Sequence, residues 1–204
     1  MKNSIKTSAK SFLVVALFAL AFTSCKKDRD IETSTPLSLQ GAKAAVASVA
    51  DTLIGNYGNP SAGPFTYGTV YADIITGAQD NDGDIDYHLL FSGFNNSTIN
   101  PASGYTLKFL NSTKSLSAIG VSDFNNATPI PSLGLNFTSD AANTTQTATG
   151  WLNYGTGGKV AAVKNFIIFV SDGDTIYALK FNNAVGEGTG SNNRGVYYFD
   201  RGVV

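Results

Sequence analysis

Short apolar runs separated by Gly, Asn and Pro dominate the chain beyond residue 55. The runs are enriched in Val, Ile, Tyr, Phe and Thr, residue types that favour strands over helices. The pattern therefore predicts strands over residues 67–76, 85–94, 104–110, 132–138, 148–154, 165–171, 174–182 and 195–201. There is no fixed-period repeat, and the length is that of one core. We therefore expect an all-β fold, an antiparallel β-sandwich-like single domain.

The most regular part of the pattern lies near the C-terminus. Residues 166–170 are apolar at every position, which predicts a central strand buried on both faces. From Tyr177 to Phe181 the large apolar residues occupy alternate positions, as in a strand with two unlike faces. The intervening Ser-Asp-Gly-Asp sequence, residues 171–174, predicts the turn of a hairpin between these strands.

Two segments have a less decisive pattern. Residues 38–54 are rich in Ala, which favours a helix, but Val46, Val49 and Leu53 fit a strand equally well, so both structures stay open. The Gly-rich sequence GEGTGSNN, residues 186–193, predicts a mobile loop before the last strand.

The first 24 residues have the pattern of a signal peptide. Three lysines precede an apolar run, residues 11–22, which is too short and too close to the N-terminus for an ordinary membrane span. The only Cys of the chain, Cys25, follows directly after Ser24. The sequence Phe22-Thr23-Ser24-Cys25 resembles a bacterial lipoprotein signal, which implies that Cys25 is lipidated. The alternative is a secreted protein that is cleaved near Ser24 and keeps a free thiol.

This interpretation divides the chain into three parts. Residues 1–24 are the signal peptide, residues 25–37 are the lipidated Cys and a polar tether, and residues 38–204 are the β-rich domain. The junction SCKKD resembles that of Bacteroidetes-type lipoproteins. The resemblance implies a lipid anchor in the outer membrane, with the domain on the cell surface.

Composition and charge exclude several classes of function. Fourteen basic residues against fifteen acidic ones leave no positive excess for phosphate contacts, so we expect no nucleic-acid partner. One His and one Cys leave little room for a thiol–imidazole pair or a zinc site. No Gly-x-Ser-x-Gly, Walker or Rossmann pattern is present where a strand would lead into a helix. We therefore expect a protein that is not an enzyme.

One stretch concentrates acidic residues at alternate positions, namely Asp80, Asp82, Asp84 and Asp86. Carboxylate oxygens at such a spacing suit Ca²⁺. However, an EF-hand counted from Asp80 would need Gly at the sixth position and Glu at the twelfth, where the chain has Ile85 and Phe91. An Asx/Gly turn before a strand uses the same residue types, and it is the alternative to a calcium site.

Several segments together resemble the HmuY-like haem-binding lipoproteins. The resemblance is carried by Asp84-Ile85-Asp86-Tyr87 with Leu89-Leu90-Phe91, by Trp151-Leu152-Asn153-Tyr154, by the hairpin of residues 166–181, and by Gly195-Val196-Tyr197-Tyr198-Phe199. It covers most of residues 50–200, and only the hairpin is distinctive. The resemblance implies a non-enzymatic surface lipoprotein that binds haem or another tetrapyrrole for iron acquisition.

The axial ligands that this family uses, typically two His and in some relatives Met, are not matched here. His88 is the only His of the chain, and the only Met, Met1, is lost with the signal peptide. Tyr also serves as a haem ligand, so the candidates are His88, Tyr105 and Tyr154. The alternative function is a glycan- or protein-binding surface β-sandwich, in which Trp151 and Tyr154 would stack on sugars.

Overall fold

The strands form three sheets in the computed structural model, which describes residues 46–138, 142, 150–155 and 159–204. These residues belong to one compact unit, Lys43–Val204. The largest sheet has six strands in the order β1-β13-β12-β11-β6-β7. Their bounds are β1 Val49–Ile54, β6 Thr106–Asn111, β7 Thr128–Ile130, β11 Phe166–Ser171, β12 Ile176–Thr189 and β13 Asn192–Val203.

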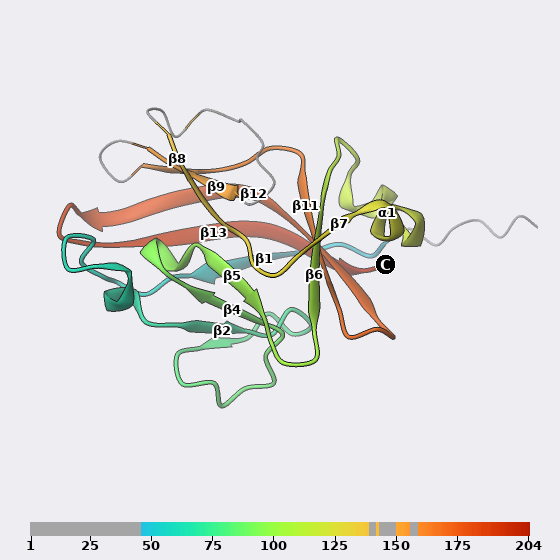
Figure 1. Ribbon diagram of the computed structural model, residues 1–204, viewed down its shortest axis with the longest axis horizontal. Coiled ribbons are helices and arrows are strands. Elements are labelled where there is room, and N and C mark those ends of the chain that lie inside the picture. Colours follow the sequence, from blue (N-terminus) through green and yellow to red (C-terminus); the bar gives the residue numbers. More distant parts are fainter. Residues whose placement is uncertain (1–45, 139–141, 143–149, 156–158) are drawn as a thin grey trace, which may run out of the picture. The chain divides into compact units, whose positions relative to one another are not determined.

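Two smaller sheets complete the sandwich. A four-stranded sheet has the order β3-β2-β4-β5, with bounds Gln79–Asp80, Val70–Ala72, Leu89–Ser92 and Thr98–Pro101 respectively. A three-stranded sheet has the order β10-β9-β8, with bounds Val160–Ala162, Gly150–Tyr154 and Gly134–Phe137. In the view of Figure 1, β8 and β9 appear above the long β12–β13 ribbon and β2, β4 and β5 below it.

Helical structure in the described residues is short. It consists of η1 Pro64–Tyr67, η2 Phe94–Asn96, η3 Leu116–Ala118 and the single α-helix α1 Val121–Asn126. No helix in this part of the chain is long and apolar enough to cross a membrane. Strands dominate the described residues, so the predicted all-β sandwich-like fold is confirmed.

The C-terminal hairpin has the predicted arrangement. Strand β11 pairs antiparallel with β12 on one side and with β6 on the other, and all six of its residues are buried. Its alternate residues face two different apolar clusters, since Ile168 belongs to one and Ile167 to the other. Strand β11 is thus a central strand that is buried on both faces, as its continuous apolar sequence indicates.

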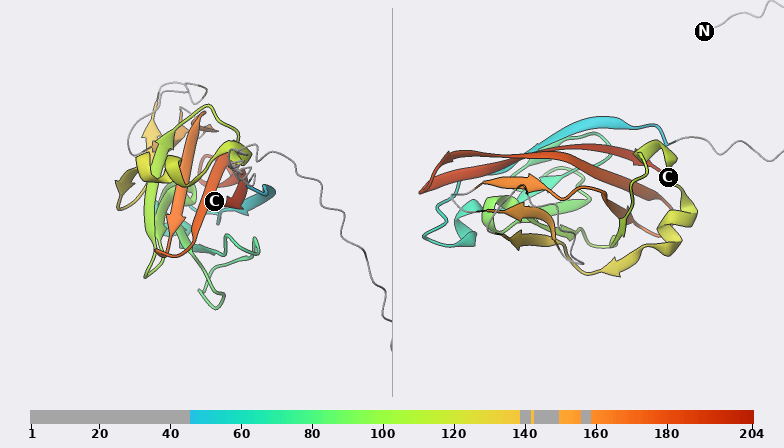
Figure 2. Two further views of the ribbon diagram at one scale, coloured as in Figure 1. Left: turned by 90° about the vertical axis from the view of Figure 1, so that its right-hand side faces the viewer. Right: turned by 90° about the horizontal axis from the view of Figure 1, so that it is seen from above.

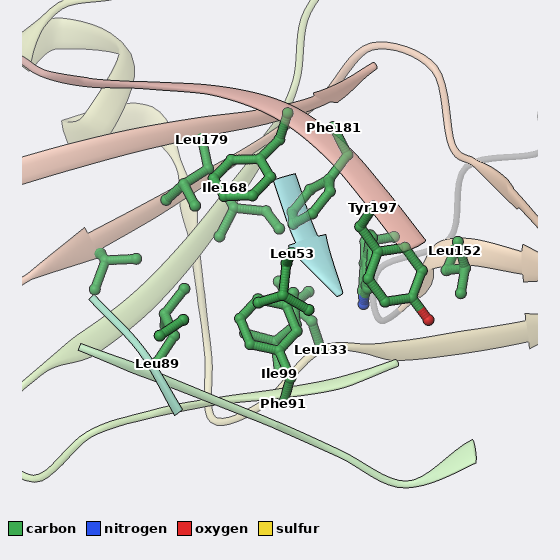
Figure 3. Packing of buried hydrophobic residues seen from close by; sticks show 14 of the residues in the cluster. Leu53, Leu89, Phe91, Ile99, Leu133, Leu152, Ile168, Leu179, Phe181 and Tyr197 are labelled. Atoms are coloured by element: carbon green, nitrogen blue, oxygen red, sulfur yellow. The ribbon is translucent and has the colours of Figure 1, made fainter. Parts of the chain in front are cut away.

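The main core lies between the six-stranded sheet and the two smaller sheets. Figure 3 shows Ile168, Leu179 and Phe181 of the large sheet facing Leu89 and Phe91 of β4. Each such side chain stabilises the fold by about 1.5–3 kcal/mol when it is fully removed from water. The core therefore depends on strands that lie far apart in the sequence.

A second apolar cluster covers the opposite face of the large sheet at one end. Leu116 of η3, together with Ile119, packs on Ile167 and Phe169 of β11. Phe124 of α1 contacts the Phe169 ring edge to face, with a distance of 5.7 Å between ring centroids. Figures 1 and 2 show α1 at the same end of the domain as the C-terminus. The helical segment thus shields this part of the sheet from water.

The predicted mobile loop at residues 186–193 is wrong. Strand β12 continues to Thr189 and β13 begins at Asn192, so most of this segment is paired in a long ribbon. Gly188 has a φ of 98°, and a Cβ there would lie 2.2 Å from the backbone oxygen of Asn192. The ribbon thus needs glycine at this position for close backbone approach, and the glycine does not indicate a loop.

Other parts of the sequence prediction are resolved or corrected. Residues 49–54 form β1, so the strand alternative holds for that part of residues 38–54, whereas residues 38–45 lie outside the described residues. Four strands were not predicted, namely β3, β5, β7 and β10. Strands β8 and β9 pair in parallel, which the predicted antiparallel arrangement did not include.

Candidate functional site

A cleft of about 630 Å³ lies beside the start of β4. Three segments form its walls: the loop after β2 from Asp73 to Thr76, residues 85–88 before β4, and the turn from Ala102 to Tyr105 before β6. It contains two of the candidate ligands predicted from the sequence, His88 and Tyr105, together with Asp86 of the acidic stretch. This combination makes the cleft the candidate site.

Backbone hydrogen bonds hold the three walls together. The amide of His88 donates to the carbonyl oxygen of Ala72 at 2.9 Å, and the amide of Ala102 donates to the carbonyl oxygen of His88 at 2.9 Å. The amide of Tyr105 in turn donates to the oxygen of Ala102 at 3.0 Å. His88 therefore lies between β2 and the 102–105 turn, and its position is fixed by the main chain.

The imidazole of His88 is enclosed by acidic and aromatic side chains. The residue is 5% exposed. Its Nδ1 lies 3.2 Å from Oδ1 of Asp73, at ion-pair distance but without hydrogen-bond geometry. Tyr105 and Tyr177 contact the ring edge to face, with centroid distances of 5.1 Å and 5.5 Å. The structure thus brings His88 and Tyr105 together in one cluster.

Asp73 stabilises the loop that forms one wall. Its Oδ1 accepts hydrogen bonds from the backbone N–H groups of Ile75, at 2.7 Å, and Thr76, at 3.3 Å, and its Oδ2 accepts one from the Thr76 hydroxyl. Burial alone would raise the pKa of the Asp73 carboxyl. The hydrogen bonds outweigh it, so the pKa lies below its ordinary value and the group stays charged. Sequence reasoning missed this residue, although an Asp three residues before a Thr is a turn signal.

The cleft has a negative electrostatic environment. Burial raises the pKa of Tyr105, and the neighbouring Asp172, Tyr177, Asp73 and Asp86 raise it further, because negative charges disfavour the phenolate. None of the residues that line the cleft is Lys or Arg. A ligand that enters the cleft therefore meets carboxylates with no Lys or Arg in the lining.

Trp151 and Tyr154 do not belong to this cleft. Trp151 is 1% exposed, and its Nε1 donates to the carbonyl oxygen of Ser97 at 2.6 Å. The rings of Phe91, Phe181 and Tyr197 surround it. No face of the Trp151 ring is therefore offered to a sugar, and the residue has a structural place in the core.

Tyr154 ends β9 and is partly exposed. Its ring contacts Phe137 of β8 edge to face, with 5.9 Å between centroids, and Phe137 is 73% exposed. The two residues form a surface aromatic pair that is separate from the residues of the His88 cleft. Sequence reasoning identified Tyr154 but missed Phe137, whose exposure depends on strand register.

The acidic stretch forms a turn at Asp80. The Asp80 carboxylate accepts hydrogen bonds from the backbone N–H groups of Gly83, Asp84 and Ile85, each at 3.0 Å. Within the residues that the structure describes, no three His, Cys, Asp or Glu side chains gather as a metal site would require. The side chains of Asp80, Asp82, Asp84 and Asp86 therefore do not converge on one point, and the Asx/Gly turn accounts for Asp80.

Cys25, the signal peptide and the tether lie outside the described residues, so their predicted roles stay predictions. No protein-family model, curated protein or solved structure matches the chain. The cleft and the sequence pattern are therefore the features of the protein that bear on its function.

Proposed function

We propose that this protein is a non-enzymatic binding lipoprotein, anchored to the outer membrane through Cys25, and that its ligand site is the His88 cleft. The observation that carries the proposal is the convergence of His88, Tyr105 and Asp73 on one cleft. Its volume of about 630 Å³ lies within the range of small-molecule sites.

The contacts of His88 support binding rather than hydrolysis. A Ser–His–Asp arrangement needs a hydrogen bond between the nucleophile and the imidazole. The hydroxyl groups of Thr76 and Ser103 line the cleft, but no hydrogen bond joins either of them to His88. The Asp73–His88 pair thus lacks the contact that would activate a nucleophile.

Haem is the ligand that the sequence resemblance implies, and the cleft fits it poorly. His88 is nearly enclosed and its ring contacts the partly exposed Tyr105, so an iron atom would reach either side chain only if this cluster opened. The propionates of haem would meet Asp73 and Asp86 with no Lys or Arg in the lining. These features support weak haem binding.

A haemin titration of the mature protein, followed by its Soret absorbance, tests this ligand. We expect weak binding with a high-spin, five-coordinate spectrum, because one chain supplies a single His. His88→Ala and Tyr105→Phe should weaken the binding further. Tyr154→Phe is the matched control, since Tyr154 lies outside the cleft. A low-spin bis-His spectrum from a monomer would contradict this account of the site.

Binding to the cleft as such is tested without assuming haem. Because His88 is the only His, its ring Hε1 proton gives a single histidine signal in the NMR spectrum. We expect at least one class of small aromatic amine, alcohol or carboxylate to shift this signal saturably. If none of them does so at millimolar concentration, and haemin also fails to bind, the cleft is not a ligand site.

The aromatic pair of Phe137 and Tyr154 favours a second function, the binding of glycans or a protein partner. Its exposed ring surface is suited to stacking on the apolar face of a sugar. A glycan-array signal that is lost in Tyr154→Ala and Phe137→Ala, and kept in His88→Ala, would support this function. Signals that are equal in all three variants would exclude this pair as the binding surface.

A further inference from the structure

We infer that the His88 cleft takes an organic cation, namely a protonated amine on an aromatic or apolar body. This inference rests on the proposed function, because it names the ligand class for the same site. It follows from the juxtaposition of the carboxylates of Asp73 and Asp86 with the rings of Tyr87 and Tyr105 and the side chain of Ile85.

Asp86 offers an unused negative charge. The residue is exposed and lines the cleft. It makes no hydrogen bond or ion pair with any residue that the structure describes. An ionised carboxylate only accepts hydrogen bonds, and a protonated amine supplies three donors and the opposite charge.

Asp73 adds a second carboxylate from another wall of the cleft. Its Oδ1 is occupied by two backbone N–H groups, whereas Oδ2 accepts only the Thr76 hydroxyl. Since a carboxylate oxygen has two lone pairs, Oδ2 keeps one acceptor site for a ligand. The cation would thus meet carboxylates from two walls of the cleft.

The aromatic rings favour the same ligand class. The ring of Tyr87 is held edge to face against Tyr71, with 4.7 Å between centroids, and Tyr105 is held against His88. Aromatic faces attract ammonium groups, and fixed rings lose little entropy when a ligand binds. Ile75 and Ile85 extend the apolar wall, which suits the body that carries the amine.

No Lys or Arg side chain lines the cleft; of its two carboxylates, Asp73 lies at ion-pair distance from His88, and Asp86 has no ion-pair partner in the described residues. Nδ1 of His88 is itself buried in the cleft wall, 3.2 Å from Oδ1 of Asp73. Lys114 pairs with Asp123 and Arg194 with Glu187, away from the cleft, whereas Arg201 pairs with Asp51 and donates to the carbonyl oxygens of Ile74 and Ile75 behind one wall.

Three probes with the same indole body separate charge from shape: tryptamine carries an ammonium group, tryptophol a hydroxyl group and indoleacetate a carboxylate. Each is titrated into the mature protein by calorimetry and by following the His88 Hε1 signal. We expect tryptamine to bind most tightly and indoleacetate most weakly. Raising the salt concentration should weaken tryptamine binding and leave tryptophol binding unchanged, because salt screens exposed charges.

Asp86→Asn tests the acidic group, and Asp84→Asn is its matched control. Both residues are exposed, but only Asp86 lines the cleft. Asp86→Asn should weaken tryptamine binding about two- to fivefold, as expected for a partly exposed charge pair, and Asp84→Asn should not. Equal binding of the three probes, or tighter binding of indoleacetate, overturns the cation inference and leaves a ligand site in the cleft. Failure of all three probes and haemin overturns the proposed function as well.

Discussion

Tyr67 is a residue whose protonation the fold controls through burial. It is 1% exposed, and its hydroxyl donates to Oδ1 of Asn193. The ring lies so close to Gly58 that a Cβ there would be 2.5 Å from its Cγ atom. Burial raises the pKa of Tyr67 to about 12, and Tyr154 contributes a smaller increase. The folded protein therefore keeps this hydroxyl protonated.

This shift predicts a loss of stability at alkaline pH. Because the pKa is about 12 in the folded state, above the ordinary value of 10.0, the stabilisation is complete below pH 10 and is lost as pH rises toward 12. Tyr67→Phe should remove this part of the pH dependence. It should also lower the free energy of unfolding at neutral pH by about 1 kcal/mol, since Asn193 loses its donor.

Urea unfolding between neutral pH and pH 11 measures both effects. Tyr198→Phe is the control, because Tyr198 is 41% exposed and should leave both quantities unchanged. Tyr197 is also buried and its pKa is also raised, so some alkaline dependence should remain in Tyr67→Phe. An unchanged alkaline slope in Tyr67→Phe would refute the assignment of this effect to Tyr67.

Trp151 illustrates what the sequence cannot decide about a single residue. An aromatic residue in a strand is either core or ligand platform according to the face on which it lies, and that face depends on register. Trp151 packs among Phe91, Phe181 and Tyr197, from strands that are distant in the sequence. Its role in the core therefore follows from long-range pairing, which no local pattern predicts.

At the level of elements, the side chain of Gln79 extends the pairing of β1. Its Oε1 accepts from the amide of Ile54 at 2.9 Å, and its Nε2 donates to the carbonyl oxygen of Ile54 at 2.9 Å. The primary amide thus imitates the backbone of a neighbouring strand. Because β1 pairs on only one side, with β13, this contact satisfies part of an otherwise open sheet edge.

Gln79→Ala should open this edge. We expect the amide of Ile54 to exchange with solvent at least severalfold faster, and the free energy of unfolding to fall by about 0.5–1.5 kcal/mol. Amide hydrogen exchange followed by NMR measures the first effect. The Leu53 amide, which belongs to a residue facing the core and paired with Tyr197, serves as the internal control. Unchanged exchange at Ile54 would show that the side chain does not protect this edge.

The elements that were predicted correctly are those with strong local patterns. Strand β11 is continuously apolar, and an Asp-Gly turn fixes its hairpin with β12, so both were visible in the sequence. The end of β12 was missed because Gly and Asn signal loops locally. Pairing between Val185 and Val196, and between Glu187 and Arg194, overrides that preference. A change of register between Phe181 and Asn183 further interrupts the period-two pattern.

At the scale of the whole molecule, the candidate site is formed by segments from different parts of the chain. His88 and Tyr105 were candidates because few residue types bind iron. Asp73 was not, because its approach to His88 depends on the pairing of β2 with β4. The residue types of the site were therefore predictable from the sequence, but the contacts between its residues, such as that of Asp73 with His88, were not. The negative charge of the cleft, on which the proposed preference for a cation rests, emerges only in the folded chain.

The proposed lipid anchor at Cys25 would determine where the cleft meets its ligand. Cys25 is the only Cys and follows an apolar run that is typical of a signal peptide. Lipidation there would attach several acyl chains, and two or more chains are needed for stable membrane anchoring. Beyond Cys25, the charged residues 26–30 would keep the tether in water. The cleft would then sample ligands at the cell surface, which suits a binding protein.

Cys25→Ala should therefore release the protein from the membrane. Without the thiol no acyl chain can be attached at this position, so the proposed anchor is lost. Fractionation of cells that express the variant, with detection in membrane and soluble fractions, measures the effect. Lys26→Ala is the matched control, since it changes the neighbouring residue and leaves the thiol in place. Equal membrane retention of Cys25→Ala and Lys26→Ala would show that the anchor does not depend on Cys25.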